Sequence, residues 1–593
     1  GYQKDNRNNI NTTLRLNYDL SSLLTKGLSV HGSIAYDSYY YSRKKYSKTF
    51  PYYLARRDAE DPDYIYLIPQ SEESIWSVST GWDKNRKVYM EFGIDYNRTF
   101  GLHKTTALIL YNQSKYYSPS LQYYVPNAYQ GLVGRLTYEY ASRYLAEFNM
   151  GYNGTENFAK GKRFGFFPAV SLGWVISEEK FFPKNNIVKY LKVRGSYGEV
   201  GNDQIGGDRF LYLPSSYGAA SDSGVNKYNF GLASNPYTSL MIVENKIGNP
   251  DLTWEKAKKM NVGVDINLFN NCLTASFDIF KEKRNNILAN RSTSPMIIGA
   301  NLPAYNFGEM ENRGWEMDLN FRHHIQDFHY WARFNYSFAR NEIIYMDEVQ
   351  KRYDYQMTTG RRKNQFFGLI FDGYYNSWEE INALDRPKSS WSGNQLQPGD
   401  VKYVDVNQDG VIDDYDMVPI GYTPVPEIIY GFSFGAQYKG FDFSILFQGA
   451  DNVSIKYFGR SMWPFAKGEE SAKSLIKERW TQERYEAGEK ITFPRLSLNP
   501  NGETDHNYRP STLWIRDASY LRLKNLEVGY TFTGGFVKRL NLNSVRLYFN
   551  GSNLFTWTDV VDLDPEAPSR SGNVEINTYP LQKVYNIGLN INF

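Results

Sequence analysis

The sequence contains a single cysteine, no long apolar run and almost no net charge. With only Cys272, an internal disulfide framework is excluded. No segment approaches about 18 consecutive apolar residues, which excludes a transmembrane helix; runs such as 107–111 and 443–447 are short. The 67 basic and 64 acidic residues leave a net charge of +3, so the charge gives no argument for a nucleic-acid partner.

What the sequence has in abundance is aromatic side chains on a polar chain. Phe, Trp and Tyr make up 17% of the 593 residues, with 50 Tyr and 36 Phe. The mean hydropathy is nevertheless −0.56. Aromatic richness on a polar background is typical of a sheet with one apolar face and one wet face.

The dominant sequence period is two, as expected for strands with one apolar face. Near the start, Leu14, Leu16 and Tyr18 alternate with polar residues. We count roughly 17 such strands of about 9 to 13 residues, the length that crosses a bilayer at a tilt. Further examples are Met90/Phe92/Ile94/Tyr96, Val262/Val264/Ile266/Leu268, Tyr430/Phe432/Phe434, Phe441/Phe443/Ile445/Phe447 and Ile587/Leu589/Ile591/Phe593.

The connections between the predicted strands alternate in length. Short ones fall at Ala141–Arg143, Asn270–Asn271 and Lys439–Gly440. Short connections on one side and long connections on the other predict an all-β, antiparallel transmembrane barrel and disfavour a sandwich or propeller. Long connections are predicted near 41–85, 202–256, 284–310, 342–424 and 451–512.

Strand parity gives an orientation and suggests an incomplete barrel. If the carboxyl end at Phe593 lies on the periplasmic side, all the long connections, including 342–424, lie outside the cell. An odd strand count makes the first strand run downward from outside, so an odd number of upstream strands is expected to be missing. An open edge in lipid would leave backbone groups unpaired at several kcal/mol each. No apolar segment after Gly1 resembles a signal peptide, so we expect that it was removed or that the chain starts partway through a longer protein.

Several segments, spread in order over nearly the whole chain, resemble the SusC-like (RagA-type) family of TonB-dependent outer-membrane transporters of Bacteroidota. A phenylalanine also ends the chain, as in that family. The segments are FFPAVSLGWVISEE (Phe166–Glu179), LKVRGSYGEVGN (Leu191–Asn202), NPDLTWEKAKKMNVGVDINLF (Asn249–Phe269), PGDVKYVDVNQDGVIDDYDMVPIG (Pro398–Gly421), WIRDASYLRLKNLEVGYTF (Trp514–Phe532) and RLYFNGSNLFTWT (Arg546–Thr558).

The resemblance implies a 22-stranded barrel in the outer membrane, with an N-terminal plug, coupling to TonB and a SusD-like lipoprotein as an extracellular lid. It also allows a dimer of such transporter–lid pairs. Residues 1–593 would then be the carboxyl-terminal barrel portion, without the plug, the TonB box and about five strands. The implied function is import of oligosaccharides or peptides with no chemistry on the cargo. The alternative is an outer-membrane adhesin or assembly scaffold that acts through its loops.

The stretch DVNQDGVIDDYD at 405–416 fits a calcium-binding loop. Its predicted ligands suit Ca²⁺, because calcium prefers hard oxygen donors at this spacing and the turn needs a glycine at Gly410. Asp413 is predicted to contribute only through a bridging water molecule. The competing interpretation is a solvated turn rich in Asp and Asn. The predicted ligands are the side chains of Asp405, Asn407, Asp409 and Asp416 and the carbonyl of Val411.

We expect such an ion to be structural, crosslinking a long loop that has no core of its own. The other motifs give weaker evidence for a functional site. Ser433 in GFSFG matches a nucleophile pattern but lacks a following helix, so no catalytic residue is predicted. His323, His324 and His329 could hold zinc, but a solvated hairpin turn is the better interpretation. Aromatic residues within 37–53 could stack on sugars, although loop packing is the simpler interpretation.

Overall fold

The computed structural model describes residues 1–593 apart from a set of short gaps. Parts of the long connections predicted at 202–256, 284–310 and 451–512 lie outside the described residues. The gaps are 59, 62, 205–208, 215–217, 220–226, 233–236, 241, 244–246, 294–301, 392–395, 458–462, 466–473, 498–504 and 567–580.

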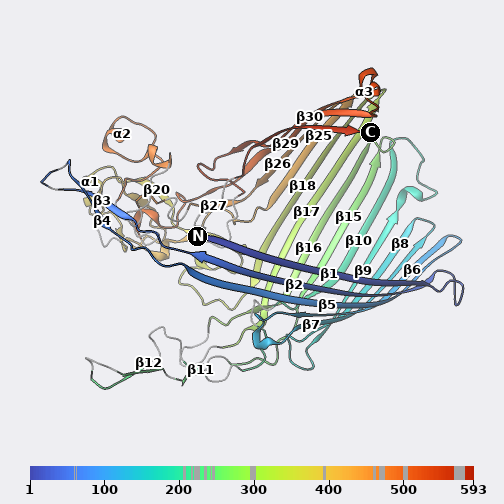
Figure 1. Cartoon of the computed structure of the whole chain (residues 1–593), viewed down its shortest axis with the longest axis horizontal. Coiled ribbons are helices and arrows are strands. Elements are labelled where there is room, and N and C mark those ends of the chain that lie inside the picture. The colour runs from blue at the N-terminus through green and yellow to red at the C-terminus, as the bar shows by residue number, and fades with distance from the viewer. Residues whose placement is uncertain are drawn as a thin grey trace.

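One antiparallel sheet of seventeen strands dominates the structure (Figure 1), which confirms the predicted all-β class and strand count. Each strand pairs with the next sheet strand along the chain. Within the described residues, β1 pairs only with β2 and β31 only with β30. The sheet strands are β1 (Tyr2–Asp19), β2 (Leu28–Ser47), β5 (Ser77–Phe100), β6 (His103–Tyr117), β7 (Asn127–Tyr140), β8 (Tyr144–Thr155), β9 (Phe164–Val175), β10 (Val188–Asn202), β15 (Glu255–Leu268), β16 (Leu273–Ala289), β17 (Tyr305–Ile325), β18 (Phe328–Tyr345), β25 (Ile428–Tyr438), β26 (Phe441–Asp451), β29 (Tyr520–Phe532), β30 (Ser544–Thr558) and β31 (Val584–Asn592).

Short elements lie in the connections. The helices are α1 (Trp378–Asn382), α2 (Gln482–Glu486) and α3 (Gly535–Arg539), and no helix of the described chain is long and apolar enough to cross a bilayer. The small strand pairs are β3 (Tyr53–Arg57) with β4 (Ile65–Pro69), β11 (Gly218–Ala219) with β14 (Ile242–Val243), β12 (Lys227–Phe230) with β13 (Tyr237–Leu240), β19 (Phe367–Gly368) with β24 (Val418–Pro419), β20 (Phe371–Tyr374) with β22 (Val401–Tyr403), β21 (Lys388–Ser389) with β23 (Val411–Ile412), and β27 (Ser454–Lys456) with β28 (Ile515–Asp517).

The pairing register brings the alternate apolar residues of all strands onto one face. Leu319 of β17 pairs with Phe334 of β18, which pairs with Phe432 of β25. Within the described residues no second layer covers the side chains of this face: Leu172 is 62% exposed and Ile279 57% exposed. A broad apolar face with no partner sheet is what a lipid-facing surface requires.

Several strands extend further than the sequence pattern indicated. β5 has 24 residues and β17 has 21, against the predicted 9 to 13. The predicted long connection at 41–85 is therefore too wide, because β2 continues to Ser47 and β5 begins at Ser77. Much of the aromatic stretch 37–53 lies in β2 rather than in a loop. Strand ends beyond the apolar band keep their backbone pairing but lose the apolar alternation that marks them in sequence.

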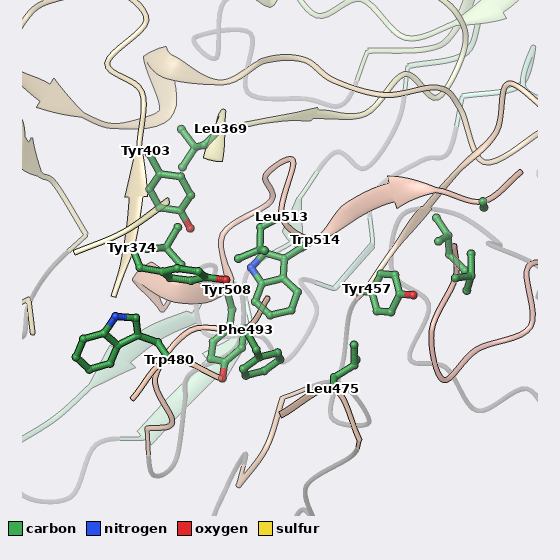
Figure 2. Packing of buried hydrophobic residues seen from close by; sticks show 14 of the residues in the cluster. Leu369, Tyr374, Tyr403, Tyr457, Leu475, Trp480, Phe493, Tyr508, Leu513 and Trp514 are labelled. Carbon is green, nitrogen blue, oxygen red and sulfur yellow. The ribbon is translucent and has the colours of Figure 1, made fainter. Parts of the chain in front are cut away.

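The long connections gather at one end of the sheet. In Figure 1, α1, α2 and β20 lie at the end where β1 begins, whereas α3 lies at the opposite end beside the carboxyl terminus. The connections 346–427 and 452–519 fold together there, and we call this pair the loop module. Its core holds Leu369, Tyr374, Val401, Tyr403, Ile412, Tyr457, Trp480, Phe493, Tyr508 and Trp514 among others (Figure 2).

The loop-module core contradicts the expectation that these loops have no core of their own. Phe493 is 1% exposed, and its ring centroid lies 5.4 Å from that of Trp514. Leu369 and Val401, from the other connection, are fully buried in the same cluster. Each fully buried large apolar side chain contributes about 1.5–3 kcal/mol, so the module has a hydrophobic source of cohesion of its own.

Candidate functional site

The acidic loop 405–416 is part of the loop module; it follows β22, contains β23 and ends with the short turn 414–416. Three of its side chains fold back onto backbone N–H groups. Asp405 Oδ2 accepts from Gly410 N at 2.8 Å, Asn407 Oδ1 from Asp409 N at 3.0 Å, and Asp409 Oδ1 from Val411 N at 2.9 Å. Gly410 has φ +81°, the left-handed conformation that glycine adopts without strain. The spacing of Asp and Asn therefore shapes a tight curl.

Asp416 closes this curl from the inside. Its side chain is fully buried, and Oδ1 accepts from Val406 N at 2.8 Å while Oδ2 accepts from Asp413 N at 2.9 Å. Burial raises the pKa of Asp416 above its ordinary value, and the negative charge of Asp405 raises it further. A buried carboxylate beside a second carboxylate is a position that a cation would stabilise.

Asp405 places a second carboxylate in this curl. Its Oδ2 accepts from Gly410 N, but its Oδ1 is buried and has no hydrogen-bond partner among the described residues. An unpartnered buried carboxylate oxygen costs about 1–3 kcal/mol or more, so it is expected to have a partner such as a cation or water.

The structure brings Asp405, Asn407, Asp409, Val411 and Asp416 onto one compact turn, and these oxygen donors fit the chemistry of Ca²⁺. In the described part of the chain, no three His, Cys, Asp or Glu side chains form a metal-holding group. An ion at this turn would therefore also need the amide oxygen of Asn407 and the carbonyl of Val411.

Asp413, considered as a water-mediated ligand, has another role in the structure. Its Oδ1 accepts from Tyr415 N at 2.7 Å and caps the short turn 414–416. The acidic loop is also tied to the rest of the module, because Ile412 is buried in the core and Lys388 N donates to Gly410 O at 2.9 Å. The acidic loop is therefore both hydrogen-bonded to and packed against the rest of the module.

His506 joins the two connections of the module. Its Nε2 lies 2.8 Å from the carbonyl oxygen of Val401 and its Nδ1 lies 3.0 Å from Ser389 Oγ. Burial lowers the pKa of His506, although the Val401 carbonyl and the nearby Asp400 and Asp505 act in the opposite direction. The folded module therefore holds a neutral imidazole.

We expect the loop module to open more readily as the pH falls from about 7 to 5. Because the pKa of His506 is lowered on folding, the unfolded state takes up a proton first and stability is lost as pH falls below the ordinary histidine value near 6.5. Limited proteolysis across this range measures the effect. The His506→Gln variant should show a flatter profile, and an equally steep profile in that variant would contradict the assignment.

The polar face of the sheet carries networks that the sequence alone did not reveal. Arg194 contacts Asp278 at 2.7 Å and Asp265 at 3.1 Å, across three adjacent strands. Arg546 similarly contacts Asp442 and Glu527. In the sequence these charged residues are visible only as the polar positions that alternate with apolar ones. The strand register is needed to show which opposite charges meet. This face is suited to water and to polar solutes.

The other sequence candidates lie on these surfaces, and in the described residues no three His, Cys, Asp or Glu side chains there form a metal-holding group. Ser433 of β25 lines a hollow of about 600 Å³ on the polar face, beside Arg333 and Asn335, and no histidine is among its lining residues. His323, His324 and His329 are exposed at the β17–β18 turn, as the solvated-hairpin interpretation predicted.

Comparison with known proteins gives one family and two kinds of relatives. A family model described as "TonB dependent receptor-like, beta-barrel" matches residues 1–554. TonB-dependent receptor P3 of Formosa agariphila is 28% identical over 479 residues, which cover 78% of this chain and 45% of that receptor. TonB-dependent receptor SusC of Bacteroides thetaiotaomicron is 28% identical over 477 residues, covering 79% of this chain and 44% of SusC.

Among solved structures, that of the RagAB peptide transporter is similar to the whole of this chain. The TM-score is 0.71 at 20% identity, with 100% of this chain and 62% of the other chain covered. At this identity the likeness shows the fold. This chain spans slightly less than half the length of the two receptors named above.

Proposed function

Because this chain belongs to the TonB-dependent receptor-like β-barrel family, whose members lie in the outer membrane, we propose that it forms the wall of an importer of bulky polar nutrients. The observation that carries the proposal is the division of one sheet into two faces. One face is apolar and uncovered, and the other carries Arg194 and Arg546 in ion-pair networks. Lipid suits the first face and a wet lumen the second.

The favoured cargo is an oligosaccharide or a peptide, admitted without chemistry on it. Support comes from the polar hollow near Ser433 and from the similarity to SusC and to a peptide transporter. We further propose that import is driven by TonB, that a SusD-like lipoprotein acts as a lid, and that such pairs dimerise. The loop module at the long-connection end would then face outside and meet the lid.

Uptake by a strain that lacks the gene tests this function. Labelled oligosaccharides and peptides of graded length are supplied, and the full-length gene is returned on a plasmid. We expect loss of uptake of one of the two classes on deletion and its recovery on complementation. Unchanged uptake of both, with altered cell adhesion or envelope assembly instead, would favour the adhesin or scaffold function and contradict import.

We also propose that the acidic loop binds one structural Ca²⁺ ion. The residues that would hold it are Asp405, Asn407, Asp409, Asp416 and the carbonyl of Val411. Support comes from Asp405 Oδ1, which has no hydrogen-bond partner among the described residues, and from the raised pKa of buried Asp416. Since the module has its own hydrophobic core, the ion would set the local shape of the acidic loop rather than hold the two connections together.

Substituting both Asp405→Ala and Asp409→Ala should remove about one bound calcium per chain, because two charged ligands are lost. Metal analysis of the dialysed full-length protein gives the stoichiometry. Asp414→Ala is the matched control, since this exposed acid lies in the same loop outside the ligand set. Calcium affinity should also fall as the pH is lowered through the raised pKa of Asp416. Unchanged calcium content in the double variant would contradict the site.

A further inference from the structure

Three tyrosine side chains gather on neighbouring strands of the sheet. Tyr89 of β5, Tyr116 of β6 and Tyr129 of β7 belong to three adjacent strands. Tyr89 and Tyr129 both lie opposite Ser114, and Tyr116 lies opposite the positions two residues before each of them. Diagonal neighbours of this kind on one face of a sheet lie about 7–8 Å apart. The three rings therefore cross the strands as one staggered row, which we call the tyrosine row.

The strand register places the tyrosine row on the polar face. Its members are out of phase with the apolar residues of the same strands, of which Phe92, Tyr111 and Leu132 lie opposite one another. Tyr116 is the second-last residue of β6, and Tyr129 is the third residue of β7. The connection between β6 and β7 leaves the sheet at the long-connection end, so the tyrosine row lies in that half of the polar face.

The rings of the tyrosine row are open to a solute. Within the described residues none of them stacks on another aromatic ring or on a cation. Tyr129 is 37% exposed, and the other two side chains are half-buried. Tyr41, on the same face of β2, differs because the guanidinium carbons of Arg7 and Arg43 each lie 5.4 Å from its ring centroid.

A notch lined by amide groups adjoins Tyr129. Gly131 of β7 lies between Asn112 of β6 and Asn153 of β8. A Cβ atom at Gly131 would lie 2.7 Å from Asn153 Oδ1 and 3.3 Å from both Asn112 Oδ1 and Tyr129 Oη, so these polar atoms surround a space that only glycine leaves open. Asn153 Oδ1 is buried and has no hydrogen-bond partner among the described residues. A buried amide oxygen of this kind is expected to accept a hydrogen bond from a ligand or water.

The charged side chains beside the tyrosine row face opposite charges. Glu91 accepts from Arg15 at 2.8 Å and from the Tyr89 hydroxyl at 2.7 Å. Lys87 lies opposite Asp37 in the register. A short peptide carries an ammonium and a carboxylate at its ends and would need counter-charges, whereas a neutral oligosaccharide carries hydroxyl groups alone. The balanced charge of this region therefore favours the saccharide.

We propose that the tyrosine row and the notch form a subsite for a neutral oligosaccharide on the wall of the importer. The C–H faces of the sugar rings lie against the tyrosine rings, and a sugar hydroxyl donates to Asn153 Oδ1. This inference rests on the proposed function and narrows its cargo. Ligand sites commonly combine an aromatic surface with a few polar groups that fix the orientation of the ligand, and the row and the notch supply one of each.

The test measures binding to the purified full-length protein in detergent by calorimetry. The probes are uncharged hexasaccharides of glucose, of mannose and of xylose, with hexagalacturonate and a hexapeptide as charged comparisons. We expect the wild-type protein to bind at least one of the neutral hexasaccharides. Its affinity should change by less than about twofold between low and high salt, because an uncharged ligand forms no ion pair that salt can screen.

The variants separate the aromatic rings from the fold. Tyr116→Leu/Tyr129→Leu should weaken binding about tenfold, at about threefold per ring, and Asn153→Ala about fivefold. Tyr116→Phe/Tyr129→Phe keeps the rings and should bind within about threefold of wild type. The matched control, Tyr111→Leu/Tyr138→Leu, changes exposed tyrosines of the same two strands on the apolar face and should bind within about twofold of wild type.

The subsite would be overturned by equal weakening in the leucine variants of the two faces, by unchanged binding in the row variant or in Asn153→Ala, or by failure of every neutral hexasaccharide to bind. Equal or tighter binding of hexagalacturonate or of the peptide would overturn the assignment to a neutral saccharide. The binding measurement does not depend on uptake. Loss of uptake in the deletion strain without saccharide binding would contradict this subsite and leave the importer, whereas saccharide binding with unchanged uptake would contradict the importer and leave the subsite.

Discussion

Replacing Trp514 with alanine should lower the free energy of unfolding of the loop module by about 3–5 kcal/mol, since a large buried ring is lost and its cavity fills incompletely. Trp514 is 3% exposed and packs against Phe493 and Tyr508, and its Nε1 donates to Asn507 O at 2.8 Å. The module lies at one end of the sheet and has its own core, so it is expected to open without unfolding the strands. Limited proteolysis should cut within 346–427 and 452–519 in the variant and spare the sheet.

The matched control is Trp378→Ala in α1 of the same module, where the side chain is 52% exposed. This variant should show cleavage close to that of wild type. If the importer function is correct, uptake should fall with Trp514→Ala because the outer mouth is no longer held in shape. Equal cleavage of the two variants would mean that the cluster in Figure 2 does not hold the module together.

Placing a charge on the apolar face should destabilise the protein by nearly as much as Trp514→Ala destabilises the loop module. Phe334→Arg in β18 should destabilise the membrane-inserted protein by about 2–4 kcal/mol if the position lies near the bilayer midplane. Phe334 pairs with Leu319 on one side and Phe432 on the other, so its neighbours offer no partner for a guanidinium. Equilibrium unfolding from phospholipid vesicles measures the loss, and the level of inserted protein in outer membranes should fall with it.

The adjacent residue, Asn335, provides the control for Phe334→Arg. Asn335→Arg places the same charge one position along β18, on the polar face beside the hollow that contains Ser433. A one-residue step moves a side chain to the opposite face of a sheet, so this variant should stay within about 0.5 kcal/mol of wild type. Similar losses for the two variants would show that both faces meet the same environment.

The sequence predicts the sheet well because one physical rule specifies it. Residues such as Phe432 and Phe434 alternate at the strand period, and burying or lipid-exposing one face fixes the register of neighbouring strands. The acidic loop was also predictable as a turn, because Asp405, Asn407 and Gly410 have strong local preferences that need no distant partner. Whether that turn holds calcium remains a prediction.

The loop module could not be predicted in the same way. Tyr403 and Trp514 lie more than a hundred positions apart and belong to stretches without a regular period, so only the folded chain shows that they share a core. The charge pairs of the sheet were hidden for a related reason, because only the register shows that Lys281 of β16 meets Glu311 of β17.

The measurement that tests the account most directly is the accessibility of paired positions to lipid and to water. Fluorescent labels are placed on Phe334→Cys and Asn335→Cys, each in the full-length protein with Cys272→Ser. Brominated phospholipid should quench the label at 334 and leave the label at 335, whereas aqueous iodide should do the reverse. Equal quenching of both labels by either agent would contradict a sheet that has lipid on one side and a wet lumen on the other.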